Sequence, residues 1–236
     1  MKLHLPKALL TAVLATCATS AAWATISVDT NTHTAKDSDS AWEMTYDPAT
    51  TTIYSATGTA EIKTGTKNDI ILSGGELFLQ TWNGSTNINL EGNLYMGSTL
   101  RVGMDSHDVN INNIYLIDSC KIYQYDDNKV RSHPVNITGT VTDKVSSNGG
   151  SIVNTGSTLT LNNHTFNFSG NVDLTKLVLE NEAKVTFTED SVLTLNSTIN
   201  INGNSTLTLN GQIKINDYTG FKRSFSGNAT TATQNG

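Results

Sequence analysis

Cysteine is nearly absent from this chain, which excludes a fold held together by disulfide bridges. Only Cys17 and Cys120 occur in 236 residues, and Cys17 falls in an N-terminal segment that we expect to be removed. One remaining thiol cannot form an intramolecular disulfide, so the fold must depend on apolar burial and backbone hydrogen bonding. Cys120 has no histidine near it in sequence, so we expect a small buried side chain rather than a nucleophile.

Basic residues are also scarce. There are 15 lysines and arginines against 21 acidic residues, which gives a net charge of −6. Proteins that bind nucleic acids or anionic membranes need a clustered basic surface, so we expect neither kind of partner. Beyond the N-terminal segment no apolar run approaches the roughly 20 residues that cross a bilayer. We therefore expect no membrane span in the mature chain.

The N-terminal segment has the pattern of a secretory signal peptide over residues 1–24. Lys2 and Lys7 supply a positive start, a short apolar core follows at residues 8–15, and residues 22–24 (Ala-Trp-Ala) match a cleavage site. A lipoprotein signal ending at Cys17 is the alternative, although threonine is bulky for the position before the lipidated cysteine. The pattern predicts export to the medium or cell surface, with the periplasm as the alternative location.

Proline and helical periodicity are both in short supply. Only 3 prolines occur, against 36 threonines and 26 asparagines. Threonine favours strands, whereas asparagine favours turns and the left-handed conformation. Outside the signal peptide no run has apolar residues at helical spacing. The composition therefore predicts an all-β chain.

A fourteen-residue repeat over residues 190–217 indicates how the strands are arranged. Apolar–polar–apolar pairs mark strands with one buried face. Four apolar positions of the first unit recur in the second: Leu193, Leu195, Ile199 and Ile201 correspond to Leu207, Leu209, Ile213 and Ile215. One unit cannot bury its own apolar face, so repetition predicts stacking into a β-solenoid.

The same pairs recur from residue 70 onward and allow two stackings. Every third pair gives three-sided rungs of roughly 18–22 residues, whereas every second pair gives two-sided rungs of roughly 13–14 residues. Two sides enclose a thin core that is hard to stabilise without disulfides, so we favour three. The alternatives differ in the neighbour of Ile213, which is Leu193 in a three-sided solenoid and Ile199 in a two-sided one.

Three runs carry a resemblance to a known group of proteins. They are GSTLRVG at 97–103, GSTLTLN at 156–162 and NSTLTLNG at 204–211. These runs resemble the degenerate repeats of bacterial autotransporter passenger and adhesin-type domains. The resemblance implies a right-handed parallel β-helix on the cell surface. It departs from that family in one respect, because no C-terminal translocator barrel follows the repeats in this sequence.

The repeats predict four regions. Residues 1–24 form the signal peptide and residues 25–60 an N-terminal cap, in which Trp42, Tyr46 and Tyr54 are candidates to cover the open end of the core. Residues 61–217 form the solenoid, which is interrupted at about 121–150. Residues 218–236 are rich in Ser, Thr, Asn and Gly, which is typical of a disordered tail.

The interruption is the strongest candidate for a binding site. Charged and aromatic insertions in repeat arrays often carry function on projecting loops, although a tolerated surface insertion is the alternative. Aromatic rings combined with planar polar groups suit sugars. The candidate binding residues are Tyr123, Tyr125, Asp127, Arg131 and His133, together with Trp82 from an earlier turn.

Catalytic and metal-binding patterns are weak in this sequence. Asp126 and Asp127 superficially resemble the double aspartate of polygalacturonases, but the Gly-His-Gly and Arg-Ile-Lys partners are missing. His107 has aspartates on either side, yet no further ligand follows at diagnostic spacing, so a solvated turn is expected. We expect no catalytic residues, no cofactor and no metal.

Two functional hypotheses follow. The first is a non-enzymatic, exported structural or adhesive β-solenoid that presents a polar surface to an extracellular partner, such as a glycan or a ligand on a host or neighbouring cell. The second is a carbohydrate-active protein, either a glycan-binding module or a polysaccharide lyase or hydrolase, that uses the segment at 121–133. An open solenoid end exposes strand edges, so we also expect self-association through it.

Overall fold

The computed structural model describes residues 26–37, 42–54, 59–80, 86–103, 107–124, 133–215, 225–226 and 231–234. The described residues are all β, with 24 strands and no helix among them, as the composition predicts. No described helix could therefore span a membrane. The predicted signal peptide lies outside the described residues, as do four of the candidate binding residues: Trp82, Tyr125, Asp127 and Arg131.

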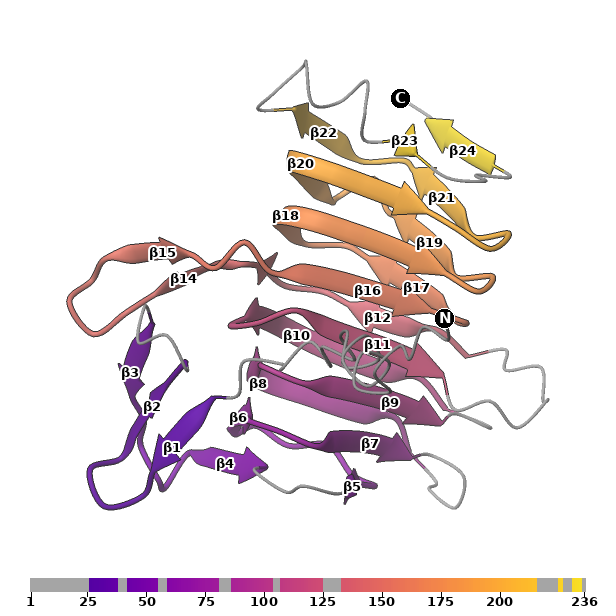
Figure 1. The fold of residues 1–236 in the computed structure, drawn as a ribbon. Coiled ribbons are helices and arrows are strands. Elements are labelled where there is room, and N and C mark those ends of the chain that lie inside the picture. Colours follow the sequence, from indigo (N-terminus) through magenta and orange to yellow (C-terminus); the bar gives the residue numbers. More distant parts are fainter. Residues whose placement is uncertain are drawn as a thin grey trace, which may run out of the picture.

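Parallel strands stack into a β-solenoid of about 6 turns (Figure 1). Its strands form three ladders, here named faces A, B and C. Face A holds β4 (Thr51–Tyr54), β6 (Asp69–Leu72), the second halves of β8 (Ile88–Met96) and β10 (Val109–Leu116), β13 (Val141–Thr142), the first halves of β18 (Asn171–Glu180) and β20 (Val192–Ile201), and β22 (Gln212–Ile215).

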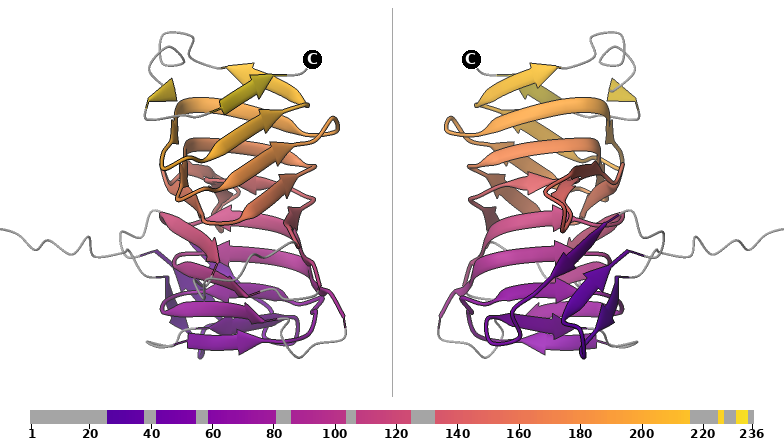
Figure 2. Two further views of the ribbon diagram at one scale, coloured as in Figure 1. Left: turned by 90° about the vertical axis from the view of Figure 1, so that its right-hand side faces the viewer. Right: turned by 90° about the vertical axis from the view of Figure 1, so that its left-hand side faces the viewer.

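Faces B and C complete each turn. Face B holds β5 (Thr59–Ile62), β7 (Glu76–Gln80), β9 (Thr99–Gly103), β11 (Cys120–Gln124), β16 (Thr158–Asn162), the second halves of β18 and β20, and β23 (Phe225–Ser226). Face C holds the first halves of β8 and β10, then β12 (Val135–Ile137), β17 (Thr165–Phe168), β19 (Lys184–Phe187), β21 (Thr206–Leu209) and β24 (Thr231–Gln234). The two views of Figure 2 show this stack from opposite sides.

The register confirms the three-sided arrangement. Ile213 pairs with Leu193, which is the neighbour that three-sided stacking requires. Leu159 pairs with Leu177, and Leu177 pairs in turn with Ile199, as expected when every third apolar pair shares a column. The predicted rung length therefore holds in the second half of the solenoid, because the period-2 apolar pairs fix which strands can share a core.

Apolar side chains from all three faces fill the interior. Along the strands, buried and partly exposed residues alternate, so each strand turns one row of side chains inward. Phe168 and Phe187 stack in this core with ring centroids 4.9 Å apart. Cys120 is buried, as predicted, and burial raises the pKa of its thiol, which keeps it protonated and unreactive.

The N-terminal region packs on the flank of the solenoid rather than over its end. Strands β1 (Ser27–Asp29), β2 (Thr34–Lys36) and β3 (Glu43–Thr45) form a small antiparallel sheet. Trp42 and Tyr46 beside it join a second apolar cluster with Ile71, Tyr95 and Tyr115 of face A. These three face A residues point outward, so an apolar surface had to be covered there. Of the three rings expected to close the core, only that of Tyr54 packs against it.

The interruption predicted at 121–150 contains both solenoid strands and a true insertion. Strands β11, β12 and β13 stay in the stack, whereas β14 (Lys144–Ser146) and β15 (Ile152–Asn154) form a hairpin that leaves it (Figure 1). The insertion explains why the next face B partner of Cys120 is as distant in sequence as Leu159. The hairpin contacts the N-terminal sheet, since the Trp42 indole N–H donates to the Ser146 carbonyl at 3.0 Å.

Both ends of the solenoid extend beyond the expected limits. Strand β4 pairs with β6, so the stack begins within the region assigned to the cap. Strands β23 and β24 pair with β20 and β21, so described parts of the expected disordered tail continue faces B and C. The rest of that tail, at 218–224, 227–230 and 235–236, lies outside the described residues.

Candidate functional site

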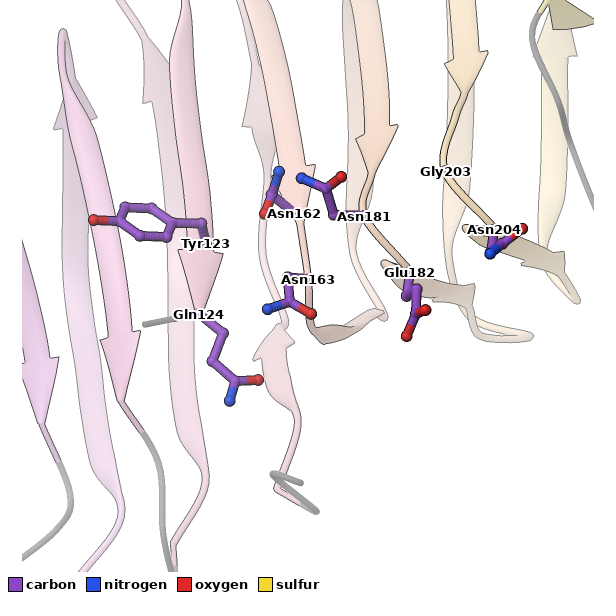
Figure 3. A pocket seen from close by; sticks show the side chains of 8 residues that line it. All are labelled: Tyr123, Gln124, Asn162, Asn163, Asn181, Glu182, Gly203 and Asn204. Atoms are coloured by element: carbon purple, nitrogen blue, oxygen red, sulfur yellow. The ribbon is translucent and has the colours of Figure 1, made fainter. Parts of the chain in front are cut away.

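A groove of about 610 Å³ runs along the corner where face B turns into face C (Figure 3). It crosses four consecutive turns, because β11, β16, β18 and β20 pair in that order. Paired strands lie about 4.8 Å apart, so the groove extends for roughly 14 Å along the solenoid axis. The lining residues are Tyr123, Gln124, Asn162, Asn163, Asn181, Glu182, Gly203 and Asn204.

Left-handed backbone conformations shape this corner. Asn163, Asn181 and Asn204 have φ angles of 49°, 50° and 60°, and Gly203 has 57°. Asparagine and glycine adopt such angles at low cost, which explains why they recur after the face B strands. Glu182 has a φ angle of 66°, a conformation that costs a glutamate about 1–2 kcal/mol.

Backbone hydrogen bonds between turns hold these residues in place. The Glu182 amide donates to the Gly203 carbonyl at 2.7 Å, and the Asn163 amide donates to the Glu180 carbonyl at 3.1 Å. The Asn162 side-chain amide donates to the Glu180 carboxylate at 3.2 Å. The walls of the groove are therefore rigid before any ligand arrives.

Tyr123 lies at one end of the groove, and residues of the two preceding turns of face B hold its side chain in place. Its hydroxyl donates to the Glu76 carboxylate, which also forms an ion pair with Arg101, 3.0 Å from its Nε. The Arg101 guanidinium lies 4.0 Å from the centroid of the Phe78 ring. Burial, reinforced by Glu76, raises the pKa of Tyr123 to about 12. The hydroxyl therefore stays protonated at neutral pH, and the ring is fixed in one orientation.

The groove has a polar base and a weakly acidic wall. Gln124 Oε1 lies 2.9 Å from His164 Nδ1, and the His164 ring meets Phe166 edge-on at 5.7 Å. Glu182 is the charged residue among those that line the groove, and it is exposed. Its carboxylate makes no hydrogen bond or ion pair with any described residue.

Of the two candidate residues that the structure describes, Tyr123 lines the groove and His133, which precedes β12, does not. His133 Nδ1 is 3.0 Å from the Asp108 carboxylate, and both side chains are about one-third exposed. The other candidates, Trp82, Tyr125, Asp127 and Arg131, lie outside the described residues.

Most of the groove was missed from the sequence. The signal was present, since Asn162-Asn163, Asn181 and Gly203-Asn204 each stand at or just after the end of a face B strand. The sequence predicts no binding role for these residues, because a turn position alone does not show that its side chain faces a hollow. The chain register was needed to bring them together.

A second, smaller groove of about 410 Å³ lies on face C. Its described lining consists of Asn89, Leu90, Glu91, Asn110, Ile111, Asn112 and Thr138, none of which is aromatic. The Asn110 side chain donates to Asn89 at 2.7 Å and accepts from Asn136 at 2.9 Å, which makes a ladder of amides along the face. These amides satisfy one another, so this groove has fewer groups available for a ligand.

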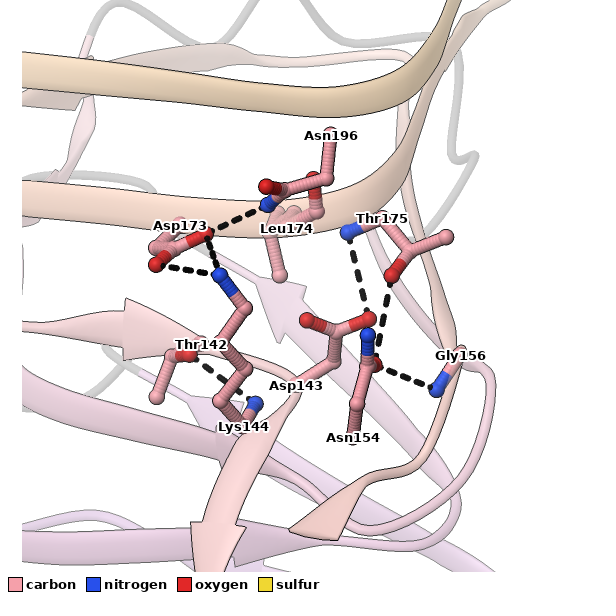
Figure 4. Close-up of polar contacts among 9 residues, drawn as sticks. All are labelled: Thr142, Asp143, Lys144, Asn154, Gly156, Asp173, Leu174, Thr175 and Asn196. Carbon is pink, nitrogen blue, oxygen red and sulfur yellow. Dashed lines mark hydrogen bonds and ion pairs between the residues drawn. The ribbon is translucent and has the colours of Figure 1, made fainter. Parts of the chain in front are cut away.

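A buried carboxylate marks the point where the hairpin leaves the solenoid (Figure 4). Asp143 is 0 % exposed; its Oδ2 accepts from the Thr175 amide at 3.1 Å, and its Oδ1 makes no hydrogen bond within the described structure. Burial raises the pKa of Asp143, and nearby Asp173 adds to the effect. Asp173 itself is neutralised by Lys144, whose Nζ lies 2.8 Å from both carboxylate oxygens.

In the described part of the chain, no three His, Cys, Asp or Glu side chains lie close enough together to hold a metal ion. Comparisons with protein-family models, with curated proteins and with solved structures returned no match for this chain. The function proposed below is therefore derived from the sequence and the geometry of the molecule.

Proposed function

We propose that this chain is an exported, non-enzymatic β-solenoid that adheres to an extracellular partner through the groove on its B–C corner. The observation that carries this proposal is the groove itself, whose polar walls come from four consecutive turns. Solenoids commonly use extended surfaces of this kind for binding, because each repeat adds one more contact in a fixed position. A rigid polar corner suits recognition of a surface ligand.

The groove chemistry supports binding rather than catalysis. Glycoside hydrolysis uses two carboxyl groups that face each other across the substrate, roughly 5 to 9.5 Å apart. Among the described residues that line the groove, Glu182 is the single carboxylate. The remaining lining residues offer amides, one phenol and backbone groups, which orient a ligand without transferring protons at neutral pH.

Export and a relation to autotransporter passenger and adhesin domains are part of the proposal. The sequence of residues 1–24 supports export, and the parallel solenoid with its Ser-Thr-Leu repeats supports the family relation. A surface protein without disulfides needs another source of stability. The continuous core and the backbone ladders of the three faces provide it.

A carbohydrate-active protein is the second candidate function. One observation favours it, namely that an aromatic residue, Tyr123, and the amide residues Asn162 and Asn163 line one groove. An aromatic face combined with planar amides is the usual chemistry of sugar recognition. This candidate shares its site with the first and differs in the chemistry of the ligand.

Two measurements test the proposed function. An antibody against the chain should detect it at the cell surface or in the medium of the native cell, and recovery only from the cytoplasm would overturn export. Beads coated with protein lacking residues 1–24 should adhere to cells or extracellular matrix. Adhesion should fall for Asn162→Ala, which removes a groove amide, and persist for Asn112→Ala in the face C groove. Equal adhesion of both variants would contradict the groove as the contact.

A further inference from the structure

We infer that the corner groove binds a linear, uncharged oligosaccharide lying along the solenoid axis, and that Glu182 contacts it directly. This inference rests on the proposed binding function and names its ligand class. Three independent features of the groove point to it: its shape, the chemistry of its walls and the backbone conformation at Glu182.

The shape of the groove fits an elongated ligand. Its residues follow the axis one turn after another, from Tyr123 through Asn162 and Asn181 to Asn204 (Figure 3). Four turns at about 4.8 Å spacing give a track of roughly 14 Å, which accommodates a short linear chain of about three sugar rings. A compact ligand would contact only one or two of these turns.

The walls offer groups that match hydroxyls. Asn162, Asn163, Asn181 and Asn204 contribute side-chain amides, each with donors and an acceptor in one plane. Sugar hydroxyls also donate and accept, so the exposed amides of Asn181 and Asn204 can bond them, whereas the buried Asn162 amide already donates to Glu180. No lysine or arginine is among the described residues that line the groove, whereas Glu182 is. Lys121 lies beside the groove, but its charge is already opposed by Glu180, 4.0 Å away. A uronic acid or sulfated sugar would therefore meet the Glu182 carboxylate, which favours neutral sugars.

Tyr123 provides a fixed surface for one end of the ligand. Its hydroxyl is engaged by Glu76 and Lys121 Nζ lies 5.7 Å from its ring centroid, so a ligand can contact only the part of the ring that lines the groove. The C–H face of a sugar ring stacks on such a surface. Because Glu76 and Arg101 hold the side chain in place, binding would cost little side-chain entropy.

The conformation of Glu182 indicates that its side chain has a role. At the equivalent corner of the next turn the chain uses Gly203 and Asn204, which adopt positive φ easily. Glu182 adopts the same conformation at a cost, and its carboxylate makes no contact within the described structure that would offset it. Residues held in unfavourable backbone conformations concentrate at ligand sites. An exposed carboxylate among the residues that line the groove is suited to accept sugar hydroxyls.

Titration calorimetry with purified protein lacking residues 1–24 tests the ligand class. The probes are cello-, manno- and chito-oligosaccharides of increasing length, with oligogalacturonate as the anionic comparison. At least one neutral series should bind, with affinity that rises up to about three rings, the length of the track, and then levels off. Tighter binding of oligogalacturonate, or affinity independent of chain length, would overturn the inference.

Glu182→Gly separates a ligand contact from a structural role. Glycine relieves the strained φ, so the melting temperature should stay equal or rise, whereas affinity for the neutral oligosaccharide should fall about tenfold or more. His33→Gly is the matched control, because His33 has a φ of 52° in the turn between β1 and β2, away from the groove. This variant should bind normally. Unchanged affinity of Glu182→Gly would remove Glu182 from the site.

The two proposals fail in different ways. If coated beads adhere but no neutral oligosaccharide binds, the adhesive function stands and the sugar inference is wrong. If the oligosaccharide binds in the groove but coated beads adhere to no surface, the sugar inference stands and the adhesive function is wrong.

Discussion

Two single residues in this molecule lower the stability of the fold, one through its backbone conformation and one through its buried charge. Glu182 is held in a left-handed conformation beside the groove, and Asp143 is buried where the hairpin begins. The strained conformation of Glu182 is not needed to build a solenoid corner, because Asn204 occupies the corresponding position one turn later and adopts the same conformation at low cost.

Asp143→Asn should stabilise the protein at neutral pH. The folded pKa of Asp143 is raised, so the fold holds this proton more tightly than the unfolded chain does. Stability is therefore lost as pH rises from the unfolded pKa through the folded pKa. Removing the charge should raise stability at pH 7 by about 1 kcal/mol, with a smaller gain at pH 4, measured by thermal unfolding.

Asp173→Asn is the comparison for this prediction. Asp173 is paired with Lys144 and about one-third exposed, so its loss should weaken the fold by less than about 1 kcal/mol at pH 7. The two substitutions remove the same charge from neighbouring positions and should change stability in opposite directions. A loss of stability in Asp143→Asn at pH 7 would contradict the assignment of an unfavourable buried charge.

At the scale of elements, the sequence predicts the stacked solenoid strands better than the N-terminal sheet that packs on their flank. The three ladders follow from apolar pairs, because a strand that shares the core must repeat its inward residues in register. The flank is harder to predict. Ile71 lies between two inward residues and points outward, as do Tyr95 and Tyr115 one and two turns later. Three outward-facing side chains of this kind indicate that another layer covers face A. The sequence does not show that they are neighbours, because this requires the register between successive turns.

Trp42 should couple the hairpin β14–β15 to the N-terminal sheet. Its ring is fully buried, packs beside Tyr95 with ring centroids 6.1 Å apart, and its N–H donates to the Ser146 carbonyl. Trp42→Ala should cost about 3–5 kcal/mol of local stability and speed amide exchange in β1–β3 and in β14–β15 together, measured by hydrogen–deuterium exchange.

A milder substitution tests the same coupling. Trp42→Phe keeps an aromatic ring but loses the hydrogen bond to Ser146 and part of the buried volume, so it should cost about 2 kcal/mol, less than Trp42→Ala. Faster exchange confined to the N-terminal sheet in Trp42→Ala would show that the two elements open independently. The solenoid core should keep its slow exchange in both variants.

At the scale of the whole molecule, a stack of this kind exposes strand edges at its ends. Within the described part of the chain, β22 pairs with β20 alone, and β4 pairs with β6 alone. Ile213 on β22 and Tyr54 on β4 both pack against the core from these terminal turns and are only partly buried. An edge that carries core residues is a template for a further strand, so each end of the stack offers a surface to another copy.

We therefore predict concentration-dependent association of the protein through its ends. Light scattering of protein lacking residues 1–24 should show a mass that increases with concentration, because joining one end to the other generates open chains of copies. Ile213→Lys places a charge on the core side of the terminal strand and should suppress association, while Thr194→Lys on the outer side of the adjacent strand should not. Both variants should keep the strand content of the parent in circular dichroism. A parent that stays monomeric at high concentration would show that the ends do not pair, and the solenoid would then present its corner groove as a single copy.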